Sequence, residues 1–193
     1  ARLAVMDQVG PDYAGFRAEI RPLVVASRSD PSLNDEVIRL SEEAANLPSE
    51  EFKHPLARII GLTGLAQLYL RREVGRVDDA IMLINEKILP LNHDLDKPFN
   101  GWDLRSELVK NGRVAFPYLQ LARAYRLKKN FVRAFNALDT AWAIDPSNYL
   151  LDPHENVRAS DIYTAVYADA LEINPNDPRA LNWRDRVRNI TQN

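Results

Sequence analysis

The segment from residue 96 to residue 107 comes nearest to a metal site. Four of its residues match positions 1, 5, 6 and 12 of a calcium-binding loop, whose ligands are oxygens: Asp96, Asn100, Gly101 and Glu107. Pro98 stands where position 3 supplies a ligand, and Asp103 stands where position 8 is apolar. Because two positions of so short a motif depart from the pattern, we expect a turn followed by a helix start, and we predict no metal site.

The remaining reactive side chains form no catalytic pattern. His93 and Asp94 are adjacent, but the other histidines, His54 and His154, lie far away in the sequence. The sequence contains no His-x-x-x-His pair, no glycine-rich phosphate loop and no Ser or Thr in a nucleophile motif. It also has no cysteine, which excludes disulfides, thiolate chemistry and cysteine-type zinc sites. We therefore predict no catalytic residue and no cofactor, and we expect a protein that is not an enzyme.

Composition limits the class of protein. The 193 residues are 46% hydrophobic and 27% charged, which suits one substantial core or a short helical solenoid. The net charge of -2 offers no broad attraction to nucleic acid or anionic lipid. Apolar runs such as Leu23-Val24-Val25-Ala26 are far shorter than the roughly 20 residues of a membrane helix. The chain starts at Ala1 without a signal-like segment, so we expect a processed periplasmic or exported protein, with a cytoplasmic one as the alternative.

Apolar periodicity and capping residues predict helices throughout, and no segment alternates with the period of a strand. Two start signals are Asp30-Pro31 and Asp177-Pro178, with Asp as N-cap and Pro at the first helical position. Asp152-Pro153-His154-Glu155 is a third, with Glu155 placed for a capping box. Gly75 ends one pattern, and a loop is expected over Leu91–Trp102. The helices are predicted over 12–26, 31–47, 49–73, 77–90, 103–110, 113–127, 131–144, 152–173 and 178–190.

The stretch from Ala115 to Asn148 has a regular order of large, small and helix-breaking residues. Ala122 and Ala134 are small enough for two antiparallel helices to approach closely, while large side chains fill the space around that contact. The residues that carry the pattern are Tyr118, Leu121, Ala122, Tyr125, Phe131, Ala134, Leu138, Ala141 and Pro146. This order resembles one 34-residue tetratricopeptide repeat.

Two further segments resemble weaker units of the same family. Leu65-Ala66-Gln67-Leu68-Tyr69 repeats the order of residues 121–125, and Ala170–Pro175 parallels Ala141–Pro146. Tyr163 stands where an alanine is expected, which argues against a close helix contact there. The helix from Arg179 is polar at Arg184 and Asp185, as suits a terminal capping helix. The predicted single domain comprises a degenerate N-terminal helix pair (1–50), a repeat (53–90), an insertion (91–112), the clear repeat (113–148), and a degenerate repeat with a capping helix (149–193).

The resemblance implies an all-α, right-handed superhelix of about eight or nine antiparallel helices with a concave face that holds a peptide or protein. In this family the first helix of each repeat lines the groove, whose positions here would be Ile60, Thr63, Gln67, Arg71, Phe116, Leu119, Arg123, Arg126, Arg179, Asn182 and Arg186. Arginines there would grip a partner with acidic side chains or a free C-terminus; the alternative is a solvated helix face. Phe99 and Trp102 are further candidates, since their segment is otherwise polar. We expect the other aromatic residues, Phe116, Trp142 and Trp183, to lie in the core.

These observations favour a protein interaction role over catalysis. The leading expectation is a scaffold or adaptor that binds a protein or peptide, in a setting such as a bacterial envelope complex, and that binds no nucleic acid. The alternatives are a regulatory or substrate-recognition part of an enzyme complex and a self-associating structural protein.

Overall fold

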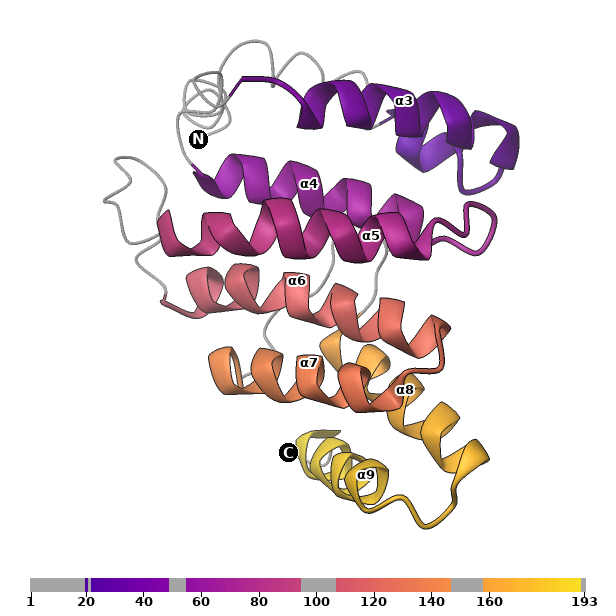
Figure 1. The fold of residues 1–193 in the computed structure, drawn as a ribbon, viewed down its shortest axis with the longest axis vertical. Coiled ribbons are helices and arrows are strands. Elements are labelled where there is room, and N and C mark those ends of the chain that lie inside the picture. Colours follow the sequence, from indigo (N-terminus) through magenta and orange to yellow (C-terminus); the bar gives the residue numbers. More distant parts are fainter. Residues whose placement is uncertain (1–19, 21, 49–54, 95–106, 147–157, 192–193) are drawn as a thin grey trace. The chain divides into compact units, whose positions relative to one another are not determined.

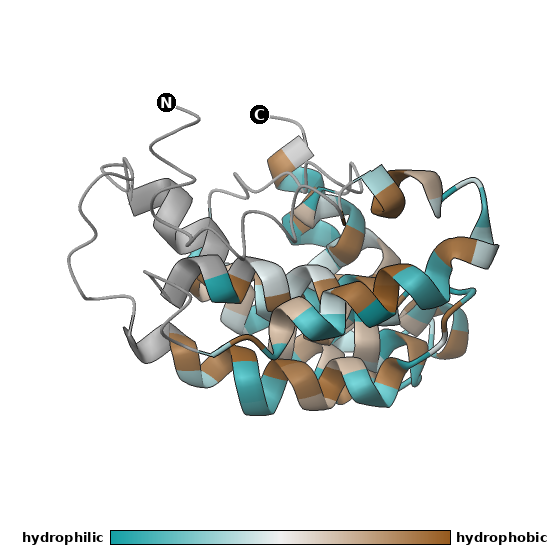
Figure 2. Cartoon of the chain, turned by 90° about the horizontal axis from the view of Figure 1, so that it is seen from above, coloured by the Kyte–Doolittle hydropathy of each residue, from teal (hydrophilic) through white to brown (hydrophobic). Residues whose placement is uncertain are grey.

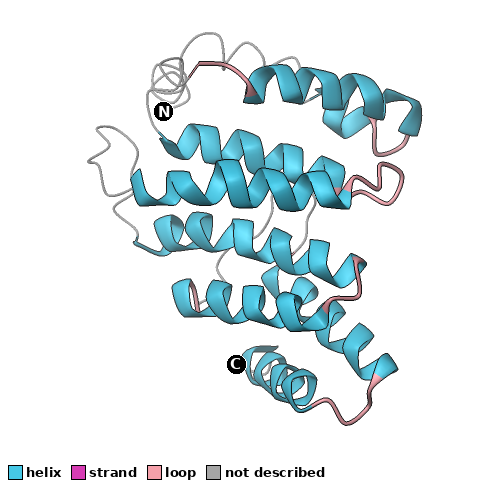
Figure 3. Ribbon diagram, in the orientation of Figure 1, coloured by secondary structure: helices cyan, strands magenta, loops and turns pink. Residues whose placement is uncertain are grey.

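Helices make up the regular structure of the described residues (Figures 1 and 3). The computed structural model describes residues 20, 22–48, 55–94, 107–146 and 158–191, and no strand occurs among them. None of the helices in these ranges is long and apolar enough to cross a membrane. The all-α prediction is confirmed, whereas the superhelical arrangement of repeats stays a prediction.

The chain divides into two units, each described here by itself. Unit 1 is Ala1–Arg105 and unit 2 is Ser106–Asn193. The division falls inside the segment 91–112, which the sequence predicts as an insertion between two repeats. Each unit has its own buried apolar residues, so each can be understood from its own helices.

The described residues of unit 1 form α-helices and short helical turns attached to them. A 3-10 turn, η1 (Pro31–Leu33), leads into α3 (Asn34–Ala45), and α4 (Pro55–Tyr69) packs against α3 on one side and α5 (Val77–Leu83) on the other. The chain continues from α5 as a π-helical turn, η3 (Ile84–Ile88), and a 3-10 turn, η4 (Leu89–Asp94). Residues 22–26 are also helical, whereas most of the helix predicted over 12–26 lies outside the described residues.

Local sequence signals explain where these helices begin and turn. The side chain of Asp30 accepts a hydrogen bond from the backbone N–H of Ser32 at 3.1 Å, as the cap prediction requires. Gly75 has a φ of 66°, in the left-handed region that glycine enters without a steric penalty. The predicted end of a helix near Pro90 is wrong, and so is the predicted loop over residues 91–94, because η4 continues to Asp94. Pro90 fits there since the first turn of a helix needs no N–H from it. The remainder of that predicted loop, residues 95–102, lies outside the described residues.

The described residues of unit 2 form α6 (Glu107–Leu127), α7 (Phe131–Ile144), α8 (Ala159–Ile173) and α9 (Pro178–Thr191). The sequence predicts separate helices over 103–110 and 113–127, but α6 is continuous from Glu107. A glycine such as Gly112 costs a helix only about 1 kcal/mol, which packing can outweigh. Pro117 lies inside α6, where it removes one backbone hydrogen bond, and its ring is buried.

Capping residues fix the starts of the later helices. Asn130 accepts a hydrogen bond from the N–H of Arg133 at 3.2 Å, and Asp177 accepts bonds from the N–H groups of Arg179 and Ala180 at 2.9 Å each. The predicted start at Asp152-Pro153, with its capping box, lies outside the described residues. In the described part, α8 begins at Ala159.

Unit 2 has a seam of small residues between its first two helices. Ala122 of α6 and Ala134 of α7 are both completely buried, and these two helices pack along each other. Figure 2 shows apolar and polar residues alternating around individual helices, as expected when one face of each is buried. The alanines predicted to let the helices approach are therefore in the core.

Between the last helices of unit 2, large aromatic residues occupy the interface in place of small ones. The rings of Trp142, Tyr163 and Trp183 form a cluster whose centroids lie 4.9 to 6.0 Å apart. Tyr163 and Trp183 are almost completely buried, and so is Phe116, which confirms the core prediction for Phe116 and Trp183; Trp142 is half-buried. A close alanine-type contact is thus absent at Tyr163, because its ring occupies that space.

Two glycines give a matched test of the backbone in unit 1. A Cβ placed on Gly64, within α4, meets no atom within 4 Å, so Gly64→Ala should stabilise the protein by about 0.5–1 kcal/mol through the lost freedom of the unfolded chain. Gly75→Ala should destabilise it by about 1 kcal/mol, because alanine is strained at positive φ. Urea denaturation would measure both, and equal effects of the two changes would contradict this account.

Candidate partner-binding surface

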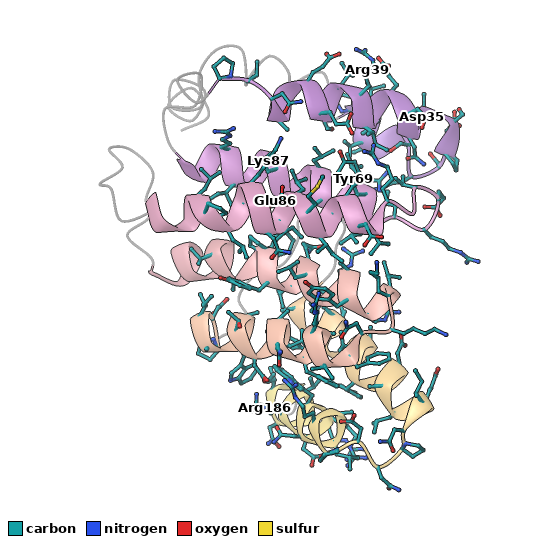
Figure 4. All side chains as sticks on the ribbon, in the orientation of Figure 1. Asp35, Arg39, Tyr69, Glu86, Lys87 and Arg186 are labelled. Atoms are coloured by element: carbon teal, nitrogen blue, oxygen red, sulfur yellow. The ribbon has the colours of Figure 1, made fainter. Side chains whose placement is uncertain are left out.

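Three of the arginines predicted to line a groove lie at helix interfaces in unit 2. Nε of Arg126 is 2.6 Å from a carboxylate oxygen of Asp169, which joins α6 to α8. Arg186 of α9 reaches Asp139 of α7 at 3.4 Å, and Figure 4 shows its side chain. Arg179, also on α9, is 2.8 Å from the other oxygen of Asp139. These guanidinium groups therefore hold neighbouring helices of their own chain.

Aromatic rings further position the two arginines of α9. The guanidinium carbon of Arg186 lies 4.9 Å from the ring centroid of Trp183, and that of Arg179 lies 5.3 Å from the centroid of Phe135. The side chains of Arg179 and Arg186 remain 39% exposed, so each ion pair contributes at most about 1 kcal/mol. Asn182, on the same helix, is exposed.

The other two predicted arginines are also engaged within the chain. Arg71 donates a hydrogen bond to the hydroxyl of Ser27 at 2.8 Å and approaches the amide oxygen of Asn34 at 3.5 Å. Arg123 donates to the amide oxygen of Gln120, a buried residue, at 3.0 Å. These contacts connect each arginine to its own unit.

The expectation that Phe116 and Leu119 face outward is wrong. Phe116 is 8% exposed and Leu119 is 3% exposed. Thr63 and Gln67, from the same predicted groove, are buried as well. Burying a leucine or phenylalanine side chain is worth about 1.5–3 kcal/mol, so apolar residues leave the surface whenever the fold lets them. Helical periodicity alone could not tell that this face is covered.

Phe99, Trp102 and the calcium-like segment from Asp96 lie outside the described residues, as does the side chain of Ile60. Within the part of the chain that the structure describes, no group of three or more His, Cys, Asp and Glu residues could hold a metal ion. Partner binding by Phe99 and Trp102 stays a prediction.

Unit 1 has an open hollow of about 520 Å³ between α3 and the turn that joins α4 to α5. Its charged lining comes from Asp35, Arg39 and Glu42 on α3 and from Glu73 and Arg76 on the turn. Figure 4 shows Asp35 and Arg39 on α3 and Tyr69 of α4. Arg39 bonds to Glu36 and Glu43 along its own helix. The mixed charges suit hydration or a polar contact, and they include no nucleophile with an adjacent base.

A hydrogen-bonded network beside the hollow joins α3 to the α4–α5 turn. The hydroxyl of Tyr69 donates to Glu42 at 2.6 Å, and Arg76 donates to the same carboxylate oxygen at 2.9 Å while it also pairs with Asp79. The guanidinium carbon of Arg76 lies 4.3 Å from the centroid of the Tyr69 ring. Burial, followed by the hydrogen bond to Glu42, raises the pKa of Tyr69. Tyr69 therefore remains a phenol that donates, and the network connects helices.

Sequence reasoning missed an apolar surface at one end of unit 2. Leu127 ends α6, Val132 is the second residue of α7, and Ile173 ends α8; their exposed fractions are 50%, 68% and 64%. We call these three residues the turn-end patch. A signal in the sequence marks this region: residues 108–138 contain seven Lys and Arg and no Asp or Glu.

Removing the carboxylate of Asp139 tests the helix-joining role of the groove arginines. Asp139→Asn should destabilise the protein by about 1 kcal/mol, because Arg179 and Arg186 lose their shared partner together. High salt should shrink the difference. Urea denaturation at low and high salt would measure it. Asp185→Asn is the control, since Asp185 pairs with the adjacent Arg184 on its own helix. An Asp139→Asn protein as stable as the control would refute the role.

The Tyr69 network should make stability fall at alkaline pH. Since the pKa of Tyr69 is raised in the folded state, the unfolded chain loses its phenolic proton first as the pH rises through about 10. The contribution of the Tyr69 phenol to the free energy of unfolding is thus present below about pH 10 and is lost as the pH rises above it. Tyr69→Phe should cost about 1 kcal/mol at pH 7 and flatten the alkaline decline. Urea denaturation between pH 7 and 11 would test this, and identical slopes for both proteins would contradict it.

Comparison with protein-family models, with curated proteins and with solved structures gave no match. The likeness to tetratricopeptide repeats therefore stays a prediction from the residues that carry it. The regular structure of the described residues is helical, and it does not establish those repeats.

Proposed function

We propose that this chain is a protein interaction module, a scaffold or adaptor that binds a partner through its helical surface. The observation that carries the proposal is the turn-end patch, where three large aliphatic side chains remain at least half exposed. Single exposed aliphatic residues are ordinary, but a group of them at one place is typical of a surface that a partner covers.

Contacts along three helices bring the patch together. Leu127 and Val132 flank a tight turn, in which the N–H of Asn130 bonds to the carbonyl oxygen of Tyr125 at 2.8 Å. Ile173 lies one helical turn beyond Asp169, the residue that pairs with Arg126 beside Leu127. The two ends of α6 and α8 are thereby tied at a point adjacent to both apolar side chains.

A second contact ties the α8–α9 connection to α7. Arg179, just inside α9, approaches the carbonyl oxygen of Val132 at 3.5 Å and bonds to Asn136 at 3.0 Å. Helix ends held in this way keep the patch in one arrangement before any partner arrives. Such preorganisation lowers the entropy that binding must overcome.

The proposed contact with a partner lies at the end of unit 2 and not in the concave groove that the sequence predicts. Three of the arginines predicted for the groove, Arg126, Arg179 and Arg186, already bind carboxylates of their own chain, and a partner would have to displace those carboxylates to use them. The exposed patch offers binding without that competition.

Site-specific photo-crosslinking tests the proposal in cells of the native organism. A photoreactive phenylalanine analogue placed at Val132 or Ile173 should join this chain to a distinct partner protein, because both side chains point into solvent. The band would be identified by mass spectrometry. Positions Val25 and Met82 of unit 1, which are 56% and 53% exposed, serve as matched controls.

A specific crosslinked protein at any of the four positions would support partner binding in general. Only crosslinking at Val132 or Ile173 would support the turn-end patch. Crosslinks between two copies of this chain would favour self-association in its place, and light scattering would then give the oligomeric state. No specific crosslink from any position, in a folded protein, would refute the proposed function.

A further inference from the structure

Positive charge borders the turn-end patch at the turn between α6 and α7. Lys128 and Lys129 form the turn between α6 and α7, Arg133 follows Val132, and all three are exposed. The chain as a whole has a net charge of -2, so this local excess of cations is a property of one region. Glu172, beside Ile173, is the exposed acidic residue in this neighbourhood.

The arginines that lie deeper do not add to this surface charge. Arg126 is compensated by Asp169, and Arg179 is compensated by Asp139. Arg133 differs, because its guanidinium carbon lies 5.6 Å from the ring centroid of Tyr125. A contact with an aromatic face orients a guanidinium group and leaves its positive charge uncompensated.

We propose that the turn-end patch binds an acidic amphipathic helix of a partner protein. This inference rests on the proposed function and names the chemistry of the partner. Leucines or similar residues on one face of that helix would cover Leu127, Val132 and Ile173. Glutamates or aspartates along its borders would meet Lys129 and Arg133. A helix can present both sets at once, since apolar residues at three- and four-residue spacing form one stripe.

The chemistry of the patch favours a protein over other anionic partners. Nucleic acids bind through basic residues together with aromatic side chains on which bases stack, and the large exposed hydrophobic residues of the described chain are aliphatic or Met. Membrane-surface helices carry their apolar residues along one continuous helical face. Here the three apolar side chains come from three helix ends.

Fluorescence anisotropy with defined probes tests the inference on the full chain. The probe is a labelled 18-residue synthetic helix (on the order of five turns) with leucines on one face and glutamates on the other. A twin with lysines in place of the glutamates and a twin with glutamines in place of the leucines test charge and apolar contact separately. The glutamate–leucine helix should bind at least about tenfold more tightly than either twin, and added salt should weaken it.

Matched variants locate the binding. Leu127→Ser with Val132→Ser should weaken binding about tenfold, whereas Val25→Ser, an equally exposed change in unit 1, should leave it unchanged. Lys129→Glu should weaken it several-fold, and Arg72→Glu, an exposed charge reversal in unit 1, should have no such effect. Circular dichroism would confirm that each variant remains folded.

The remaining outcomes overturn the inference. One is equal affinity for the acidic and the basic helix. Another is an affinity for the acidic helix that the patch variants leave unchanged. A third is preference for phosphatidylserine vesicles or a single-stranded oligonucleotide over the acidic helix. If photo-crosslinking finds a partner while the acidic helix fails to bind, the proposed function stands and only the acidic-helix inference falls. If the acidic helix binds as expected and crosslinking finds no partner, the surface chemistry stands and the cellular role falls.

Discussion

Close packing of α6 against α7 is the constraint on which unit 2 depends. Ala122 and Ala134 are completely buried, and side chains this small let two helix backbones approach until the larger residues around them interlock. That contact sets the turn at residues 128–130 and so determines where Leu127 and Val132 emerge. The packing of α6 against α7 therefore forms part of the core and also fixes the position of the exposed residues at the end of this helix pair. A larger residue at either alanine would separate the helices and displace both.

The charged residues show how context changes the role of a side chain. Arginines spaced along a helix face are compatible with a groove for an acidic partner, yet Arg126, Arg179 and Arg186 reach carboxylates on adjacent helices of the same chain. An internal carboxylate is held close at all times, so it competes well with any external one. Cations on the turn at Lys128 and Lys129 project from the end of a helix pair, and they remain at the surface beside exposed apolar side chains. Charge at helix interfaces thus stabilises the fold, whereas the cations at the helix ends lie on the surface.

Much of the secondary structure could be predicted because its causes are local. Asp30, Asn130 and Asp177 cap helices through bonds to N–H groups two or three residues away, and Gly75 allows a left-handed turn. The continuity of α6 across Gly112 could not be predicted in this way. A helix keeps an unfavourable residue when packing along its length compensates, and packing depends on segments distant in the sequence.

The sequence alone determined that the chain is helical, that its helices begin at particular caps, and that Ala122 and Ala134 belong to the core. Only the tertiary structure decided that Phe116 and Leu119 are covered, that Asp139 holds two arginines of α9, and that Leu127, Val132 and Ile173 stay exposed at one end of unit 2. The physical reason is the separation along the sequence over which each kind of interaction acts. Caps and turns act over a few residues, whereas burial and ion pairing between helices depend on which distant segments come to lie beside one another.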